Sequence, residues 1–193
     1  MHPKIHPAEI GFDFDGVIAD TVEAFIRIAC EQFDHCGIRP ADITDFLVER
    51  CLDMDAGLAE SIFLQILNDS VGTGLLPMPG AVEVLEELSS QAQVTIVTAR
   101  PLAEPVHHWL QTVFDPSVYR QMQVVAMGDH DDKVRHIRQL GLTAFIDDRA
   151  ETCQQMHQAG IQAIVFAQPW NQHRHCLPSV QTWQEIRNLC LAP

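Results

Sequence analysis

The sequence predicts an α/β protein with a doubly wound parallel sheet and a small all-helical insert after its first strand. Three observations predict this fold class. Short apolar runs rich in valine and isoleucine alternate with segments of helical periodicity from residue 94 onward. An earlier stretch of the chain shows helical periodicity alone. Polar residues follow the apolar runs where strands would end, which is where open α/β sheets bind their ligands.

The first strand is expected in the apolar run IGFDFDGVI, which turns at Gly16. Residues 21–70 then carry apolar side chains at helical spacing, without the alternation of a strand. The run LLPMPG, residues 75–80, is rich in helix breakers and opens the next helix. The expected division is a helical cap at residues 20–78, with an α/β core (Rossmann-like) at residues 1–19 and 79–193.

Beyond the cap, strands and helices are expected to alternate, because each short β-branched run is separated from the next by one amphipathic segment. The expected elements are a helix at 81–91, a strand at 94–99, a helix at 104–114, a strand at 122–127, a helix at 133–141, a strand at 143–147, a helix at 150–160, a strand at 162–167 and a final helix at 182–191.

Composition narrows the class of protein and its partners. At 193 residues and 47% hydrophobic residues, the chain is long enough for one substantial core. A formal net charge of -14 argues against nucleic acid and anionic membranes as partners, because both require clustered lysine and arginine. No leader-like or membrane-spanning apolar run is present, so we expect a cytoplasmic protein. The six cysteines form no CxxC pair, and we expect them to be free thiols.

The polar residues at the expected strand ends should converge on one crevice, because parallel strands end at the same edge of a sheet. Lys133 is expected at or just before the start of the helix that leads to the fourth strand. The other converging residues are Asp13, Asp15, Thr98, Arg100, Asp147 and Asp148.

This set of residue types is suited to phosphoryl transfer. Asp13 and Asp15 are two residues apart, so in an extended strand their side chains would share a face, about 7 Å apart. Clustered carboxylates need a cation, and hard oxygen ligands with room for water suit Mg²⁺. One aspartate would attack phosphorus, the cation and Lys133 would hold the phosphoryl charge, and the other aspartate would exchange protons with the ester oxygen and water.

Four short motifs occur in the order that is typical of one superfamily. They are DFDGV at 13–17, the threonine of TIVTAR, Lys133 fourteen residues before an acidic pair, and FIDDR at 145–149. The chain therefore resembles the haloacid dehalogenase (HAD) superfamily, and LPMPG resembles the return to the core after a C1-type cap.

The resemblance implies a role for each matching residue. Asp13 matches the nucleophile, and Asp15 matches the general acid and base that also offers its backbone carbonyl to Mg²⁺. Thr98 matches the hydroxyl that binds phosphate, and Lys133 matches the residue that neutralises charge. Asp148 or Asp147 matches the remaining metal ligand. Asp148 is placed first because the 5′(3′)-deoxyribonucleotidases also end this strand in two aspartates, and the second of the two is their ligand. The substrate phosphate is expected to bind Thr98, Ala99, Arg100 and Lys133.

The substrate is expected to be a small phosphomonoester. Acidic residues far outnumber arginines in the cap, which contains no lysine, so a polyphosphate would be repelled. The IDDR and TAR segments and QPWNQ at 168–172 resemble the deoxyribonucleotidase branch. A nucleoside monophosphate or a small sugar or acid phosphate fits these expectations. Arg100 could either reach the phosphate or form a surface ion pair.

Three alternatives use the same residues. A phosphomutase of the same superfamily needs the same two aspartates. A receiver domain shares the alternating fold, an acidic Mg²⁺ pocket, a hydroxyl and a lysine, although it places them in a different order and has no helical insert. A non-catalytic binding module is the third alternative, and turnover of a generic phosphomonoester would separate the enzyme from this module and from the receiver domain.

Overall fold

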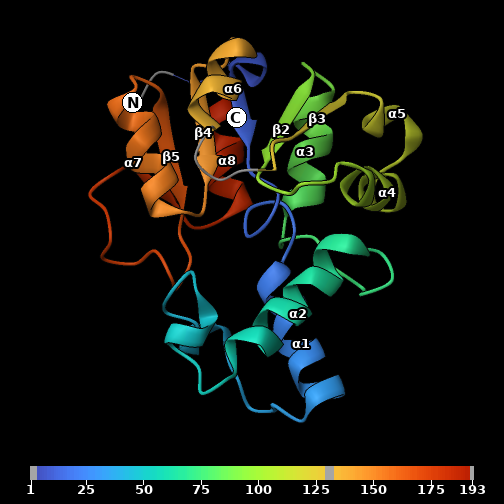
Figure 1. Ribbon diagram of the computed structural model, residues 1–193. Helices are drawn as coiled ribbons and strands as arrows, with labels where there is room; N and C mark the ends of the chain where they lie inside the picture. Colours follow the sequence, from blue (N-terminus) through green and yellow to red (C-terminus); the bar gives the residue numbers. More distant parts are fainter. Residues whose placement is uncertain (1–3, 129–132, 192–193) are drawn as a thin grey trace.

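The computed structural model describes residues 4–128 and 133–191, and it contains a six-stranded parallel sheet flanked by helices (Figure 1). The strand order is β3-β2-β1-β4-β5-β6, so the chain moves outward on one side of β1 and then crosses to the other. The switch point therefore lies between β1 and β4. The strands are β1 (Ile10–Phe12), β2 (Val94–Thr98), β3 (Met122–Ala126), β4 (Ala144–Asp147), β5 (Gln162–Phe166) and β6 (Ser179–Val180).

Side chains alternate between the two faces of the sheet, as the pleat requires. On β4, Ile146 packs on the face covered by α3 (Ala81–Ser89) and α8 (Trp183–Cys190). Its neighbour Phe145 packs on the opposite face, against α6 (Lys133–Gln139) and α7 (Ala150–Gln158). The remaining core helices are α4 (Glu104–Val113), α5 (Pro116–Tyr119) and the short η1 (Pro7–Glu9).

Between β1 and α3 the chain forms a helical insert, which lies at one end of the sheet in Figure 1. Its main helices, α1 and α2, pack against each other, and Phe25 stacks on Phe63 with 4.7 Å between the ring centroids. The two segments that join the insert to the core are hydrogen-bonded to each other. The Asp20 amide donates to Leu76 O and the Met78 amide donates to Ile18 O, both at 2.8 Å. The insert contains α1 (Thr21–Phe33), η2 (Pro40–Asp42), η3 (Val48–Arg50) and α2 (Ala56–Asn68).

The first strand is shorter than expected. β1 ends at Phe12, and the chain leaves the sheet after the Asp13 amide has donated to Ile146 O at 2.9 Å. Asp13 and Asp15 therefore do not lie on one extended strand, and their side chains have separate partners. Helix α5 and the two-residue strand β6 were not predicted, because both are too short to give a periodic signal.

The strand order bears on one of the alternatives. Receiver domains have the order 2-1-3-4-5, in which the second strand is at an edge. In the present sheet β2 lies between β3 and β1. The receiver alternative is therefore wrong.

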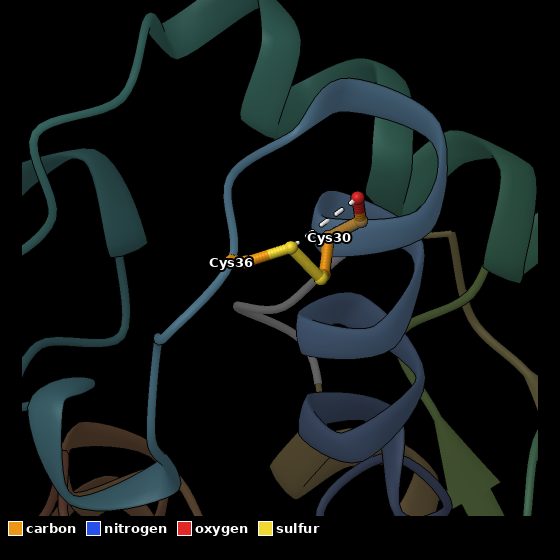
Figure 2. Close-up of a disulfide and its surroundings, with 2 residues drawn as sticks. All are labelled: Cys30 and Cys36. Atoms are coloured by element: carbon orange, nitrogen blue, oxygen red, sulfur yellow. Dashed lines mark hydrogen bonds between the residues drawn. A yellow bond between two sulfur atoms is a disulfide. The ribbon is translucent and has the colours of Figure 1, made fainter.

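The expectation of six free thiols is also wrong, because Cys30 and Cys36 form a disulfide (Figure 2). Helix α1 ends where Asp34 adopts a left-handed conformation with φ 61°, and the His35 amide bonds back to Ala29 O at 3.0 Å. This reversal brings Cys36 back beside the last turn of the helix, with 4.3 Å between the two Cα atoms. A spacing of six residues gives no hint of the pairing, because the reversal depends on the helix end.

In the part of the chain that the structure describes, no helix has both the length and the apolar character needed to cross a membrane.

We expect the unreduced, denatured protein to expose four reactive thiols, at Cys51, Cys153, Cys176 and Cys190. Replacing Cys36 by serine should lower the free energy of unfolding by about 2 kcal/mol, because the disulfide restricts the unfolded chain. The loss should be at the low end for disulfides, since the closed loop is short. Thiol titration and denaturant unfolding measure the two effects.

The matched control is Cys176→Ser, which removes an exposed free thiol and should leave the unfolding free energy unchanged. Six reactive thiols without reductant would contradict the pairing.

Candidate active site

A pocket of about 650 Å³ opens between the carboxyl ends of the strands and the helical insert. All the polar residues that the sequence analysis placed at strand ends line it, together with Ala99. The core contributes Asp13, Asp15, Thr98, Ala99, Arg100, Lys133, Asp147 and Asp148 to its wall.

Lys133 lies between two carboxylates at the base of the pocket. Its Nζ is 3.0 Å from Asp13 Oδ1 and 2.7 Å from Asp147 Oδ2. The register of β1 against β4 pairs Phe12 with Ile146, so Asp13, directly after β1, lies at the level of Asp147, the last residue of β4. Helix α6 begins at Lys133 and points its side chain, which is 4% exposed, into this corner.

The two aspartates of the acidic pair have different surroundings. Asp147 Oδ1 accepts from the Arg149 amide at 2.8 Å, so both its carboxylate oxygens have donors. Asp148 Oδ2 accepts from the indole N–H of Trp170 at 2.9 Å. The carboxylates of Asp13, Asp147 and Asp148 each offer an oxygen within 4.8 Å of the others.

Burial dominates the electrostatics of this cluster. Desolvation raises the pKa of Asp13 to about 7. The positive charge of Lys133 opposes this rise, and the negative charge of Asp147 adds to it. Burial and the charges of Asp147 and Asp13 also raise the pKa of Asp148 well above its ordinary value. Burial by itself would lower the pKa of Lys133, but the two carboxylates raise it above its ordinary value, so the lysine is charged.

The donor set fits a divalent cation. When ionised, the three clustered carboxylates carry three negative charges, and Lys133 supplies one positive charge. Two negative charges are left, which a divalent ion would neutralise. Burial is the main cause of the raised pKa values of Asp13 and Asp148, and repulsion from the neighbouring carboxylates adds to it. Few carboxylate ligands with room for water suit Mg²⁺.

Asp15 is held in a separate, paired arrangement. Arg100 donates to both its carboxylate oxygens, from Nε to Oδ2 at 2.8 Å and from Nη2 to Oδ1 at 2.7 Å. The Thr21 hydroxyl donates to Oδ1 at 2.6 Å. Burial opposes ionisation, but these partners outweigh it and lower the pKa of Asp15. Arg100 is buried and also donates to Ser70 Oγ at 2.7 Å, so it is not a surface ion pair.

Thr98 is buried at the end of β2, and its hydroxyl accepts from the Arg100 amide at 3.2 Å. Helix α4 begins only at Glu104, so the amides of Ala99 and Arg100 belong to a loop. Both residues line the pocket.

The insert forms the opposite wall of the pocket, which is largely apolar. Phe46 is 38% exposed, and the Arg149 guanidinium lies 5.1 Å from its ring centroid. Asp45 pairs with Arg174 at 2.8 Å, which connects this wall to the loop after β5. The apolar residues of the wall are Val22, Ile43, Phe46, Leu47, Val48, Phe63 and Leu67.

The loop after β5 contributes contacts that sequence reasoning did not find. Besides Trp170, it places Gln168 Nε2 2.8 Å from Gly16 O and the Asn171 side chain between two backbone carbonyls. The motif QPWNQ marks this segment as distinctive, but its contacts are made to residues far away in the sequence. Only the fold brings them together.

Comparisons with known proteins agree with this geometry. The model of a family described as "5′ nucleotidase, deoxy (Pyrimidine), cytosolic type C protein" matches residues 7–192. A comparison with curated proteins finds no match.

Several solved structures share the fold. A haloacid dehalogenase-like hydrolase from Streptococcus pneumoniae has a TM-score of 0.62 at 15% identity, over 93% of this chain and 96% of that one. A predicted phosphoglycolate phosphatase from Haemophilus somnus has a TM-score of 0.61 at 15% identity, over 93% and 96% of the two chains. A HAD-superfamily hydrolase from Geobacter sulfurreducens has 0.59 at 15%, over 93% and 94%. The resemblance expected from the sequence motifs is confirmed.

Replacing Arg100 by glutamine should lower the free energy of unfolding by about 2–3 kcal/mol, because Asp15, whose side chain is 28% exposed, would lose its main partner. Denaturant unfolding near pH 8 measures this loss, which should shrink as the pH falls and Asp15 gains a proton.

Arg187→Gln is the matched control, since it breaks an exposed pair with Glu87 and should cost less than about 1 kcal/mol. Equal losses of unfolding free energy in the two variants would show that the pair of Asp15 and Arg100 contributes no more to stability than an exposed ion pair.

The raised pKa of Asp13 predicts how stability depends on pH without metal. The unfolded carboxyl loses its proton near 3.8, whereas the folded one keeps it up to about 7. Between these values the folded protein binds more protons, so rising pH destabilises it. In EDTA, Asp13→Asn should therefore melt about 4 °C or more above the wild type at pH 8, and its gain at pH 5 should be roughly 40% of that, because pH 5 is only about one unit above the unfolded pKa.

Differential scanning fluorimetry at the two pH values measures this change. Asp115→Asn, at an exposed helix start, is the control and should show no such pH-dependent gain. A constant difference between Asp13→Asn and the wild type at both pH values would contradict the assignment.

Proposed function

Because the chain belongs to the family described as 5′ nucleotidase, deoxy (pyrimidine), cytosolic type C, we propose that it is a Mg²⁺-dependent phosphatase that hydrolyses nucleoside monophosphates. The observation that carries this proposal is the position of Asp13, a buried carboxylate beside a charged lysine at the base of a pocket. Asp13 is the nucleophile in this proposal, and the reaction passes through an aspartyl phosphate.

The residues of the acidic cluster would hold the cation. Asp13 and Asp148 are the proposed side-chain ligands, with Asp147 beside them, and the Asp15 backbone carbonyl is a further ligand that the superfamily resemblance implies. When bound, Mg²⁺ neutralises charge on the phosphoryl oxygens. Lys133 adds a fixed positive charge on the other side of Asp13.

The proposed reaction has two steps. In the first, the Asp13 carboxylate attacks phosphorus, the bond to the ester oxygen breaks, and that oxygen takes a proton from Asp15. In the second, a water molecule attacks phosphorus and gives a proton to Asp15. The bond between phosphorus and the Asp13 oxygen breaks, which releases phosphate and restores the Asp13 carboxylate. Thr98, Ala99 and Arg100 border the space that the phosphate occupies.

Asp15 must carry a proton when the ester bond breaks. A carboxylate bound by a guanidinium and a hydroxyl cannot donate a proton, so Asp15 must leave Arg100 and become protonated before the ester bond breaks. Thr21 and Ser70 come from the insert, which means that the position of the insert bears on this release.

We propose that residues 20–78 act as a cap that closes over the phosphate and recognises the rest of the substrate. Phe46 and Phe63 offer aromatic faces to a base, and the apolar wall suits a nucleoside better than a charged group. Asp45, Glu49 and Glu60 also line this wall and would repel further phosphates, which favours a monophosphate. The family description supports a pyrimidine deoxynucleotide as the substrate.

The family description also supports a cytoplasmic location for the enzyme. Disulfides are rare in that compartment, because its thiols are kept reduced. Neither Cys30 nor Cys36 lines the pocket, so we expect activity with the disulfide either formed or reduced.

Phosphate release from a panel of substrates tests the proposal. The panel contains pyrimidine and purine deoxynucleoside 5′-monophosphates, phosphoglycolate and a small sugar phosphate. We expect release in Mg²⁺ that EDTA abolishes, and a loss of about 10³-fold or more in Asp13→Asn. The pyrimidine deoxynucleotides should have the highest kcat/KM.

Asp115→Asn, which replaces an exposed aspartate far from the pocket residues in the sequence, should retain full activity. Residual activity in Asp13→Asn comparable to this control would rule out the aspartyl phosphate. Isomerised product without phosphate release would instead indicate a phosphomutase.

A further inference from the structure

The loop between β5 and β6, residues 167–178, contacts two parts of the active site. Gln168 Nε2 donates to Gly16 O, in the turn that follows Asp13 and Asp15. The indole of Trp170 donates to the Asp148 carboxylate. The loop therefore connects the two segments that would provide the cation ligands.

The base of this loop is fixed by Asn171, which is 2% exposed. Its Nδ2 donates to Phe166 O at 2.8 Å and to Asp148 O at 2.7 Å, while its Oδ1 accepts from the Gln168 amide at 3.1 Å. One carboxamide thus joins the end of β5 to the backbone of Asp148. Trp170 lies next to Asn171 in the sequence, so its indole is held at a defined distance from the Asp148 side chain.

Close packing leaves the indole and the carboxylate little freedom. A Cβ atom at Gly16 would clash with Asp148 Oδ2 and would lie 3.3 Å from Trp170 Cζ2. Trp170 is 7% exposed and Asp148 is 5% exposed. The Asp148 carboxylate is therefore confined between the Gly16 turn and the Trp170 ring.

The hydrogen bonds distinguish the two aspartates of the pair. Both carboxylate oxygens of Asp147 have donors, from Lys133 and from the Arg149 amide. Within residues 4–128 and 133–191, the Trp170 indole is the one hydrogen-bond donor that we find to the Asp148 carboxylate, and it occupies Oδ2. Among the described residues Oδ1 has no hydrogen-bond donor, which makes it available to another ligand.

We propose that Trp170 is a positioning residue for the cation site: its indole N–H holds Asp148 Oδ2, so that Oδ1 is directed to the divalent ion. The inference rests on the proposed function, which supplies the ion, and it assigns the role of orienting the ligand to a residue outside the superfamily motifs. Hydrogen bonds to metal-ligating carboxylates fix their orientation, and their loss weakens metal binding.

The test is Mg²⁺ binding to the whole protein, measured by isothermal titration calorimetry. Trp170→Phe keeps an aromatic ring but lacks the N–H donor. We expect its Kd for Mg²⁺ to rise about 10- to 100-fold. The Mg²⁺ concentration for half-maximal phosphatase activity should rise in parallel, while KM for the nucleotide at saturating Mg²⁺ stays unchanged.

Trp109→Phe is the matched control, because Trp109 is a buried tryptophan whose indole donates to Leu75 O at 2.7 Å rather than to an acidic residue. Its Mg²⁺ affinity should equal that of the wild type. Equal affinity in Trp170→Phe and Trp109→Phe would overturn the inference and leave the proposed function intact. Absence of Mg²⁺ binding by the wild type would overturn both.

A second measurement does not depend on the folding of Trp170→Phe. In the wild type, Mg²⁺ should change tryptophan emission, since the charge next to the Trp170 N–H changes when the ion binds. The change should persist in Trp109→Phe. Emission that does not respond at a Mg²⁺ concentration that saturates the calorimetric signal would overturn the inference.

Discussion

The active-site end of the molecule depends on how buried charge is balanced where β1 and β4 end. Asp13 and Asp147 meet there because the two strands are in register, and Lys133 enters from the start of α6 to lie between them. One lysine cannot neutralise this pair and Asp148 together when all three carboxylates are ionised. Ionising all three without a metal costs stability, and the same imbalance favours binding of a cation.

The second buried pair separates two carboxylates that are close in the sequence. Because β1 ends at Phe12, Asp13 stays with Lys133 while Asp15 joins Arg100. One carboxyl therefore has a raised pKa and the other a lowered one, because desolvation dominates at the buried Asp13, whereas the bonds of Asp15 to Arg100 and Thr21 outweigh its desolvation. Arg100 also bonds to the insert through Ser70, so the state of Asp15 is connected to a segment outside the sheet.

Much of this site could be predicted from the sequence, because strand ends are visible as places where an apolar run meets a polar residue. Asp13, Thr98 and Asp147 were found in this way, because alternating strands and helices indicate a parallel sheet whose strands end at one edge. The direction of Arg100 could not be predicted, because a side chain of that length can reach several partners. Trp170 and Cys36 were missed for a similar reason: their partners are set by a loop path and a helix end, and neither leaves a periodic pattern.

The central position of β1 also has a consequence for synthesis of the chain. The strand is made before both of its neighbours, and β2 and β4 emerge much later. Until then Ile10–Phe12 and the apolar residues after it have no sheet to join. Non-local pairing of this kind is slow, so the first strand stays exposed on the nascent chain until β2 and β4 have left the ribosome. The aspartate at its end reaches its final surroundings only when β4 pairs with it.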